Sequence, residues 1–261
     1  MIDRPLNLLA HREVFHLEFL RRLSEKLDPK AFALKGGVNL RLFFGSARYS
    51  EDLDLDFAGP SLDRFREIVM AALRSRSFLD AMMSYGVREV GLPDLLKAKQ
   101  TETTQRFKIH LLTSAGEDLP TKIEISRRDL REGVVVELVP DAVIRAYRTA
   151  PLWIPHYGLD AAILQKTEAL AGRAAVQARD IFDLHLLLPR LGAEQGVLPL
   201  PAGVSRRARE RLFEVEFDVF RDTVLSYLRL EDRAAYDRSE AWDELRLKVA
   251  GYLERAEERH V

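Results

Sequence analysis

The stretch that decides the fold is short and acidic: Ser50-Glu51-Asp52-Leu53-Asp54-Leu55-Asp56-Phe57. Carboxylates alternate with apolar side chains, which is the pattern of a β-strand with one buried face. In such a strand, side chains two residues apart point to the same face and lie about 6.6 Å from each other. The three aspartates are therefore expected on one face of a sheet and the apolar residues on the opposite face.

Like charges in a row repel each other, and a bound cation relieves this repulsion. Aspartate oxygens are also the ligands that Mg²⁺ prefers, together with water and phosphate oxygens. The stretch equally fits the solvated edge of an amphipathic strand, although aspartate is depleted in strands. Asp52 and Asp54 are thus candidate ligands of Mg²⁺ or Mn²⁺.

Two neighbouring stretches support a phosphate and metal site. Gly36-Gly37 lies between a predicted strand and a predicted helix, so its backbone N–H groups can approach a phosphate at the helix N-terminus. Lys122-Ile123-Glu124-Ile125 predicts a further strand with a cation and a carboxylate on one face. Beside the acidic strand, Glu124 would be a third ligand in a two-metal site. The alternative for Glu124 is a salt bridge with Lys122 or an arginine.

The rest of the chain separates into two parts. Expected elements are helix 6–27, strand 31–34, helix 38–44, strand 53–57, a helix from Ser61 to about 74, strands 106–112 and 122–125, and helices 160–173, 179–188, 206–230 and 239–258, with a connector at 192–203. Strands with interspersed helices precede mainly helices. We therefore predict an α+β domain at 1–145, with a mixed sheet and flanking helices, and a helical C-terminal domain at 146–261 that completes the nucleotide site.

Composition limits the possible functions. The 261 residues include 40 Lys plus Arg and 41 Asp plus Glu, and this balance gives no bulk attraction to nucleic acid, although a local basic groove is compatible with it. Cysteine is absent, which excludes disulfides, thiolate metal sites and cysteine nucleophiles. The sequence has no signal core and no apolar run of about 20 residues, so we expect a cytoplasmic protein without membrane contact.

These motifs resemble those of the AbiEii/AbiGii nucleotidyltransferase toxins, within the polymerase-β-like nucleotidyltransferase superfamily. The matching stretches, in order, are Leu34–Leu42 with Arg48–Asp54, Lys122–Ile125, Lys166–Arg173 and Arg179–Leu184. Together they lie within residues 34–184. The chain departs from the family at Val38 or Asn39, where Thr or Ala is common, and these positions are expected to pack or hydrogen-bond locally. Many relatives have an apolar residue in place of Asp56, so Asp56 receives no primary role.

The resemblance implies a bacterial enzyme of a type IV toxin–antitoxin or abortive-infection system. It would transfer a nucleoside monophosphate from a nucleoside triphosphate to RNA, with the tRNA 3′ end as acceptor, and a winged-helix antitoxin is the implied partner. Two alternatives stay open: transfer to a protein or small molecule, and a catalytically silent nucleotide-binding protein.

In the helical domain, Lys166 and Arg173 share one helix face, and Asp180 and Asp183 share a face of the next helix. Taken alone, they predict surface salt bridges between neighbouring helices. With the family resemblance, Lys166 and Arg173 become candidates to hold the triphosphate. Asp180 would orient Lys166, contact the nucleotide or assist proton removal, and Asp183 would contribute to the nucleotide site or fix Arg179 or a helix N-terminus.

Three further residues lie near the predicted phosphate site. Lys35 and Arg48 are candidates to offset phosphate charge, with exposed structural cations as the alternative. Ser50 is a candidate to contact the triphosphate or to be modified, and a turn residue is the alternative.

Overall fold

The computed structural model describes residues 7–58, 61–94, 101, 103–127, 129–192, 196–201 and 203–259. The predicted helix start at Leu6 and part of the predicted connector at 192–203 lie outside these ranges. The chain forms two compact units. Unit 1 comprises Met1–Phe43 and Tyr49–Tyr157, and unit 2 comprises Phe44–Arg48 and Gly158–Val261.

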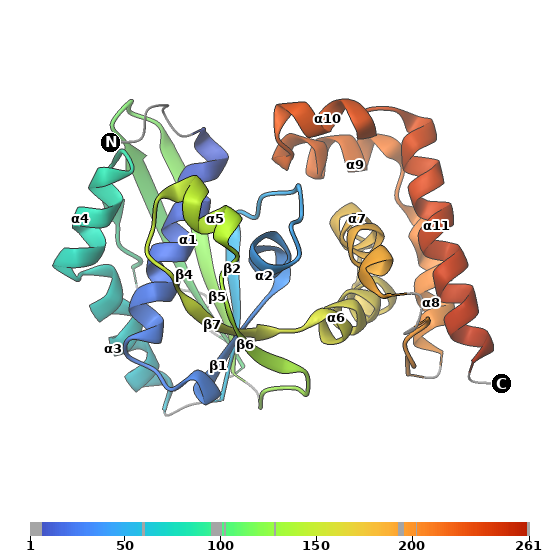
Figure 1. The fold of residues 1–261 in the computed structure, drawn as a ribbon, viewed down its shortest axis with the longest axis horizontal. Helices are drawn as coiled ribbons and strands as arrows, with labels where there is room; N and C mark the ends of the chain where they lie inside the picture. Colours follow the sequence, from blue (N-terminus) through green and yellow to red (C-terminus); the bar gives the residue numbers. More distant parts are fainter. Residues whose placement is uncertain are drawn as a thin grey trace. The chain divides into compact units, whose positions relative to one another are not determined.

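Unit 1 is built on a seven-stranded mixed sheet with strand order β3-β4-β5-β2-β1-β7-β6 (Figure 1). The strands are β1 Phe32–Lys35, β2 Asp52–Phe57, β3 Val87–Gly91, β4 Thr104–Thr113, β5 Asp118–Arg127, β6 Val134–Leu138 and β7 Trp153–Tyr157. β2 is antiparallel to β1 and parallel to β5. The acidic stretch therefore runs through the middle of the sheet, while β6 lies at one edge.

Helices cover the apolar face of this sheet. The helices of unit 1 are α1 Leu8–Ser24, α2 Gly36–Phe43, α3 Leu62–Leu73, α4 Arg76–Ser84 and α5 Asp141–Tyr147, with a 3₁₀ turn at Pro29–Ala31. Leu53 and Leu55 of β2 are fully buried in a core that includes Phe15 of α1 and Phe65 of α3. As predicted, Ser61 caps α3, because its hydroxyl accepts a hydrogen bond from the backbone N–H of Arg64.

Helix α2 begins directly after β1, without a loop between them. Gly36 makes this turn possible with φ of +69°, a left-handed conformation that glycine adopts without strain. The two positions at which the chain departs from the family lie on this helix. Val38 is buried in the core, and Asn39 donates a hydrogen bond from Nδ2 to the carbonyl of Tyr157 at 2.8 Å. Both therefore act locally, as expected.

Unit 2 is helical. Its helices are α6 Leu159–Gly172, α7 Ala178–Leu187, α8 Val204–Arg211, α9 Phe217–Thr223, α10 Leu230–Tyr236 and α11 Ser239–Glu258, with 3₁₀ turns at Leu188–Arg190, Leu212–Glu214 and Leu225–Tyr227. Helix α11 has the predicted bounds. In the core, the ring of Phe220 stacks on Trp242 with 4.3 Å between centroids, and Trp242 Nε1 donates to the Val215 carbonyl at 3.0 Å.

The structure corrects two predictions about organisation. The boundary predicted at 145/146 was too early, because β7 pairs with both β1 and β6 and so belongs to the sheet; the division lies at Tyr157/Gly158. The continuous helix predicted at 206–230 is wrong, since this range holds α8, α9 and two 3₁₀ turns. None of the helices in the described ranges is long and apolar enough to cross a lipid bilayer.

Candidate functional site

The predicted carboxylates of unit 1 lie on two adjacent strands. In the parallel pairing of β2 with β5, Asp52 is opposite Lys122 and Asp54 is opposite Glu124. All four are partly exposed, whereas Leu53 and Ile123 between them are fully buried. The alternation therefore places Asp52, Asp54 and Glu124 side by side on the polar face of the sheet.

Two cations contact these carboxylates. Lys122 Nζ lies 2.9 Å from Asp52 Oδ2 and 3.5 Å from Glu124 Oε2. Arg106 of β4, directly opposite Glu124, places Nε 2.7 Å from Glu124 Oε2. The salt bridges that were the alternative for Glu124 are therefore present.

The charges of these groups shift their proton affinities. Partial burial alone would raise the pKa of Glu124, but the hydrogen bond and charge of Arg106, together with Lys122, hold it below its ordinary value. Burial alone would lower the pKa of Lys122, yet the hydrogen bond and charge of Asp52 raise it. Both shifts favour the charged forms of Glu124 and Lys122.

Gly36 lies against Asp54. A Cβ built at Gly36 would collide with Asp54 Oδ2, so only glycine leaves room for the carboxylate there. The carboxylate thus sits at the start of α2, where unpaired N–H groups favour negative charge. The same features make this helix start, with Gly36 and Gly37, a place where a phosphate oxygen can approach the backbone.

Lys35 and Asp56 form a further ion pair on this sheet. Lys35 Nζ donates to Asp56 Oδ1 at 2.6 Å and to Ser126 Oγ at 2.8 Å. The hydroxyl of Tyr157 donates to Asp56 Oδ2 at 2.8 Å. Burial, with the Asp56 carboxylate adding to it, raises the pKa of Tyr157 to about 12. Lys35 is therefore held in an ion pair with Asp56, and Asp56 is a buried acid with a structural role.

Ser50 has a local contact. Its hydroxyl donates to the carbonyl of Asp52 at 2.9 Å, which closes the turn before β2. This geometry corresponds to the turn role that was the alternative for Ser50.

The predicted residues of unit 2 form a buried network of charges. Lys166 Nζ of α6 lies 3.0 Å from Asp180 Oδ1 and 2.6 Å from Asp183 Oδ2, both on α7. Both aspartate side chains are fully buried. Burial would lower the pKa of Lys166, but the charges of Asp183 and Asp180 raise it. These are buried contacts, so the surface salt bridges predicted from spacing alone are wrong.

Arg48 and Arg173 complete this network. Arg48 Nη2 lies 3.1 Å and 3.0 Å from the two oxygens of Asp183, and both side chains are buried. Asp183 is therefore fixed by Arg48 and Lys166, in place of the predicted Arg179 or helix N-terminus. Arg173 Nε lies 2.8 Å from Asp180 Oδ2 without hydrogen-bond geometry, and its side chain is 38% exposed. Arg173 is thus the cation of this network with the greatest access to a ligand.

The donor atoms fit a divalent cation, although the carboxylates are engaged elsewhere. Within the described ranges, no three His, Asp or Glu side chains are grouped so that they could hold a metal ion as they stand. Asp52, Asp54 and Glu124 nevertheless offer hard oxygen donors from adjacent strand positions, which is the ligand chemistry of Mg²⁺ and Mn²⁺. Lys122 and Arg106 already pair with two of these carboxylates, Asp52 and Glu124, so a metal ion would compete with these cations for the same oxygens.

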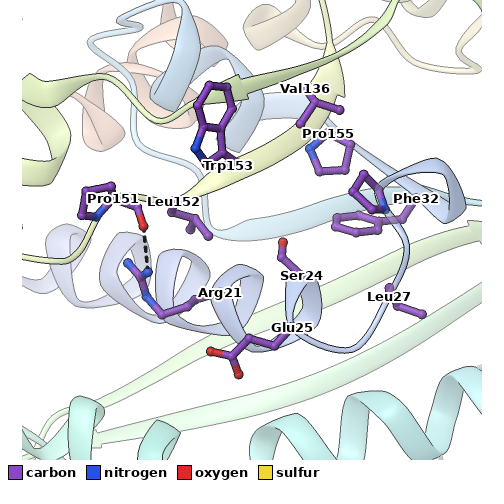
Figure 2. Close-up of a pocket in the computed structure, with 11 residues that line it drawn as sticks. Arg21, Ser24, Glu25, Leu27, Phe32, Val136, Pro151, Leu152, Trp153 and Pro155 are labelled. Atoms are coloured by element: carbon purple, nitrogen blue, oxygen red, sulfur yellow. Dashed lines mark hydrogen bonds between the residues drawn. The ribbon is translucent and has the colours of Figure 1, made fainter.

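Unit 1 also has a pocket of about 320 Å³, away from the carboxylates of β2 and β5. It lies between the end of α1, the turn before β1, and β7, and Figure 2 shows Trp153, Pro155 and Phe32 around it. Arg21 at its rim donates to the Pro151 carbonyl at 3.1 Å. None of the predicted site residues lines this pocket, and its mainly apolar walls do not suit a triphosphate.

Sequence reasoning missed several contacts of the site. Arg106 could have been found, because it occupies an alternate position of a predicted strand and matches an acid on the next one. Tyr157 and Arg48 carried no such signal, since their partners Asp56 and Asp183 are 101 and 135 residues away in the chain.

A protein-family model matches most of the chain. The family model described as "Nucleotidyl transferase AbiEii toxin, Type IV TA system" matches residues 18–253. No curated protein sequence matches the chain.

Solved structures that are similar in fold include two with TM-scores above 0.5. JHP933 from Helicobacter pylori superposes with a TM-score of 0.58 at 19% identity, covering 98% of this chain and 94% of that one. MenT4, a nucleotidyltransferase toxin from Mycobacterium tuberculosis H37Rv, gives a TM-score of 0.52 at 19% identity, covering 95% and 84%. The predicted family and α+β fold class are confirmed.

Proposed function

This chain belongs to the AbiEii nucleotidyltransferase toxin family of type IV toxin–antitoxin systems, and we propose that it transfers a nucleoside monophosphate from a nucleoside triphosphate to an RNA 3′ end. The proposed acceptor is tRNA. The observation that carries the proposal is the grouping of Asp52, Asp54 and Glu124 on adjacent strands beside the Gly36 turn.

Asp52, Asp54 and Glu124 would hold the divalent cation. When bound, Mg²⁺ or Mn²⁺ would polarise the phosphate and make the acceptor hydroxyl a better nucleophile. Gly36 and Gly37 would let a phosphate oxygen approach the N–H groups at the start of α2. Asp54 is kept in position by the absence of a side chain at residue 36.

The reaction is an in-line displacement at the α-phosphate. A hydroxyl oxygen of the acceptor forms a bond to the α-phosphorus, the bond from this phosphorus to the bridging oxygen breaks, and pyrophosphate leaves. The hydroxyl proton passes to solvent water as the new bond forms. Fixed cations are effective here because they stabilise charge that develops in the transition state.

Arg173 and Lys166 are the proposed phosphate-binding cations of unit 2. Arg173 would contact a phosphate through its exposed guanidinium group, and Lys166 would add a fixed ammonium. Asp180 contacts both, which supports a positioning role over direct proton transfer, since its side chain is fully buried. Arg48 and Asp183 form the buried ion pair that completes this network.

The proposed partner is a winged-helix antitoxin encoded beside this chain, as the family resemblance implies. The proposed acceptor has two competitors, a protein and a small molecule. The third alternative, a silent nucleotide-binding protein, is disfavoured because Asp52, Asp54, Glu124 and Lys166 are all present.

Labelled nucleotides test the proposal. Purified protein is incubated with each α-labelled nucleoside triphosphate, Mg²⁺, and either total tRNA or protein extract. We expect label in tRNA, dependent on added metal, and a loss of about a thousandfold in Asp52→Asn. The matched control is Asp118→Asn, an exposed acid on β5 that pairs with His110 and should retain activity. Label found in protein alone would refute the RNA assignment.

A further inference from the structure

Four side chains form a two-by-two block on the polar face of β2 and β5. Asp52 is opposite Lys122, and Asp54 is opposite Glu124. Three of the four are acids, and the fourth is a lysine whose Nζ lies 2.9 Å from Asp52 and 3.5 Å from Glu124. One ammonium group is therefore shared by carboxylates of both strands.

We propose that Lys122 is an internal counter-ion that competes with the divalent cation for Asp52 and Glu124. The inference rests on the proposed function, because it requires these carboxylates to bind metal. An ammonium and a divalent cation repel each other, so both cannot remain in close contact with the same carboxylate oxygens. Lys122 must therefore leave them as the metal binds, and the metal affinity is lower than the acids alone would give.

The counter-ion also has a benefit for the protein without metal. Three neighbouring carboxylates repel one another when no cation is present. In the metal-free protein, Lys122 reduces this repulsion and so stabilises the pairing of β2 with β5. The same contact thus stabilises the metal-free protein and weakens metal binding.

A neighbouring lysine provides a control for the effect of removing one positive charge from this part of the sheet. Lys108 of β4 is directly opposite Lys122 in the sheet and is exposed. It forms no ion pair with any residue that the structure describes. Replacing Lys108 removes the same charge from the next strand without touching the contacts of Lys122, so Lys108→Gln is a matched control.

Mn²⁺ binding to the full chain without nucleotide tests the inference, with free Mn²⁺ measured by electron paramagnetic resonance. We expect Lys122→Gln to bind Mn²⁺ about fivefold more tightly than the unchanged protein, a modest factor because the ion pair is partly exposed. Lys108→Gln and the charge-conserving Lys122→Arg should stay within about twofold. Thermal unfolding gives a second readout: Lys122→Gln should melt at a lower temperature without metal and gain more from added Mn²⁺.

The outcomes separate this inference from the proposed function. Unchanged or weaker Mn²⁺ binding by Lys122→Gln overturns the counter-ion role, as does equal tightening by Lys108→Gln. The proposed metal site fails on different grounds, if Asp52→Asn binds Mn²⁺ as tightly as the unchanged protein.

Discussion

Gly36 meets two constraints at one position. Its φ of +69° disfavours any side chain, and a Cβ would collide with the Asp54 carboxylate. Another glycine with positive φ separates the two effects. Gly116, in the turn between β4 and β5, has φ of +94°, but no atom lies within 4 Å of the position that a Cβ would take there.

The substitution Gly36→Ala should therefore reduce both stability and transfer. We expect a loss of about 1–2 kcal/mol in the free energy of unfolding from the backbone strain, and a loss of at least about tenfold in nucleotide transfer because Asp54 is displaced. Urea unfolding and the labelled-nucleotide assay measure the two effects. Gly116→Ala should cost similar stability yet keep activity, and a matching loss of activity there would show that strain alone is responsible.

At the level of single residues, the placement of the candidate site residues was predictable where it follows from local spacing. Alternation along one strand placed Asp52 and Asp54 on a common face, and a second short pattern supplied Glu124. The partners of these acids depend on strand order, which the sequence does not state. The pair of Arg48 with Asp183 joins distant segments and could not be inferred from either one.

Helix α1 is tied to strand β5 by a buried histidine. His16 Nε2 lies 3.1 Å from Thr121 Oγ1, and the Thr121 hydroxyl donates to the Glu51 carbonyl at 2.6 Å. Burial, with the charge of Arg12, lowers the pKa of His16 to about 3. The folded protein therefore keeps this imidazole neutral at pH values where the unfolded chain protonates it.

This difference makes stability depend on pH. The contribution of neutral His16 is fully present above its unfolded pKa of 6.5 and is lost as pH falls towards about 3, because the unfolded chain then binds the extra proton. Between pH 7 and 5 we expect a loss of about 2 kcal/mol from this group. Urea unfolding at several pH values should show a flatter dependence of stability on pH for His16→Asn than for the unchanged protein. An unchanged slope in His16→Asn would contradict the assignment.

Whole elements were predictable where their pattern was strong. Helix α11 was found at its observed bounds, and β2 within one residue. Strand β7 was missed because Pro155 lies inside it, and proline lacks the N–H that a ladder needs. The range from Arg206 to Leu230 has no glycine or proline to mark its breaks, so helix α8, helix α9 and the 3₁₀ turn after each of them were predicted as one helix.

At the scale of the whole molecule, the chain passes between its units three times. Residues Phe44–Arg48 belong to unit 2, although residues on both sides of them belong to unit 1. Within unit 2, Arg48 pairs with Asp183 and forms a β-bridge with Leu228. No single cut in the chain therefore separates the two units completely.

Splitting the protein tests this. Fragments 1–157 and 158–261, produced together with a tag on one, should purify as a complex because residues 44–48 complete the second fragment. Arg48→Met should reduce recovery of the untagged fragment at least about tenfold, since it removes one partner of a buried pair. Arg76→Met, which breaks the exposed pair with Asp80, should leave recovery unchanged. Fragments that purify apart would contradict the prediction.

Strand β6 leaves one rim of the sheet open. It carries three consecutive valines, two of them exposed, and its outer backbone faces no strand among the described residues. Such a rim is a template onto which the same segment of another molecule can add, strand upon strand. In concentrated solution, loss of this protein to fibrous or amorphous precipitate is therefore expected to start at β6, far in sequence from the acidic stretch that defines the fold.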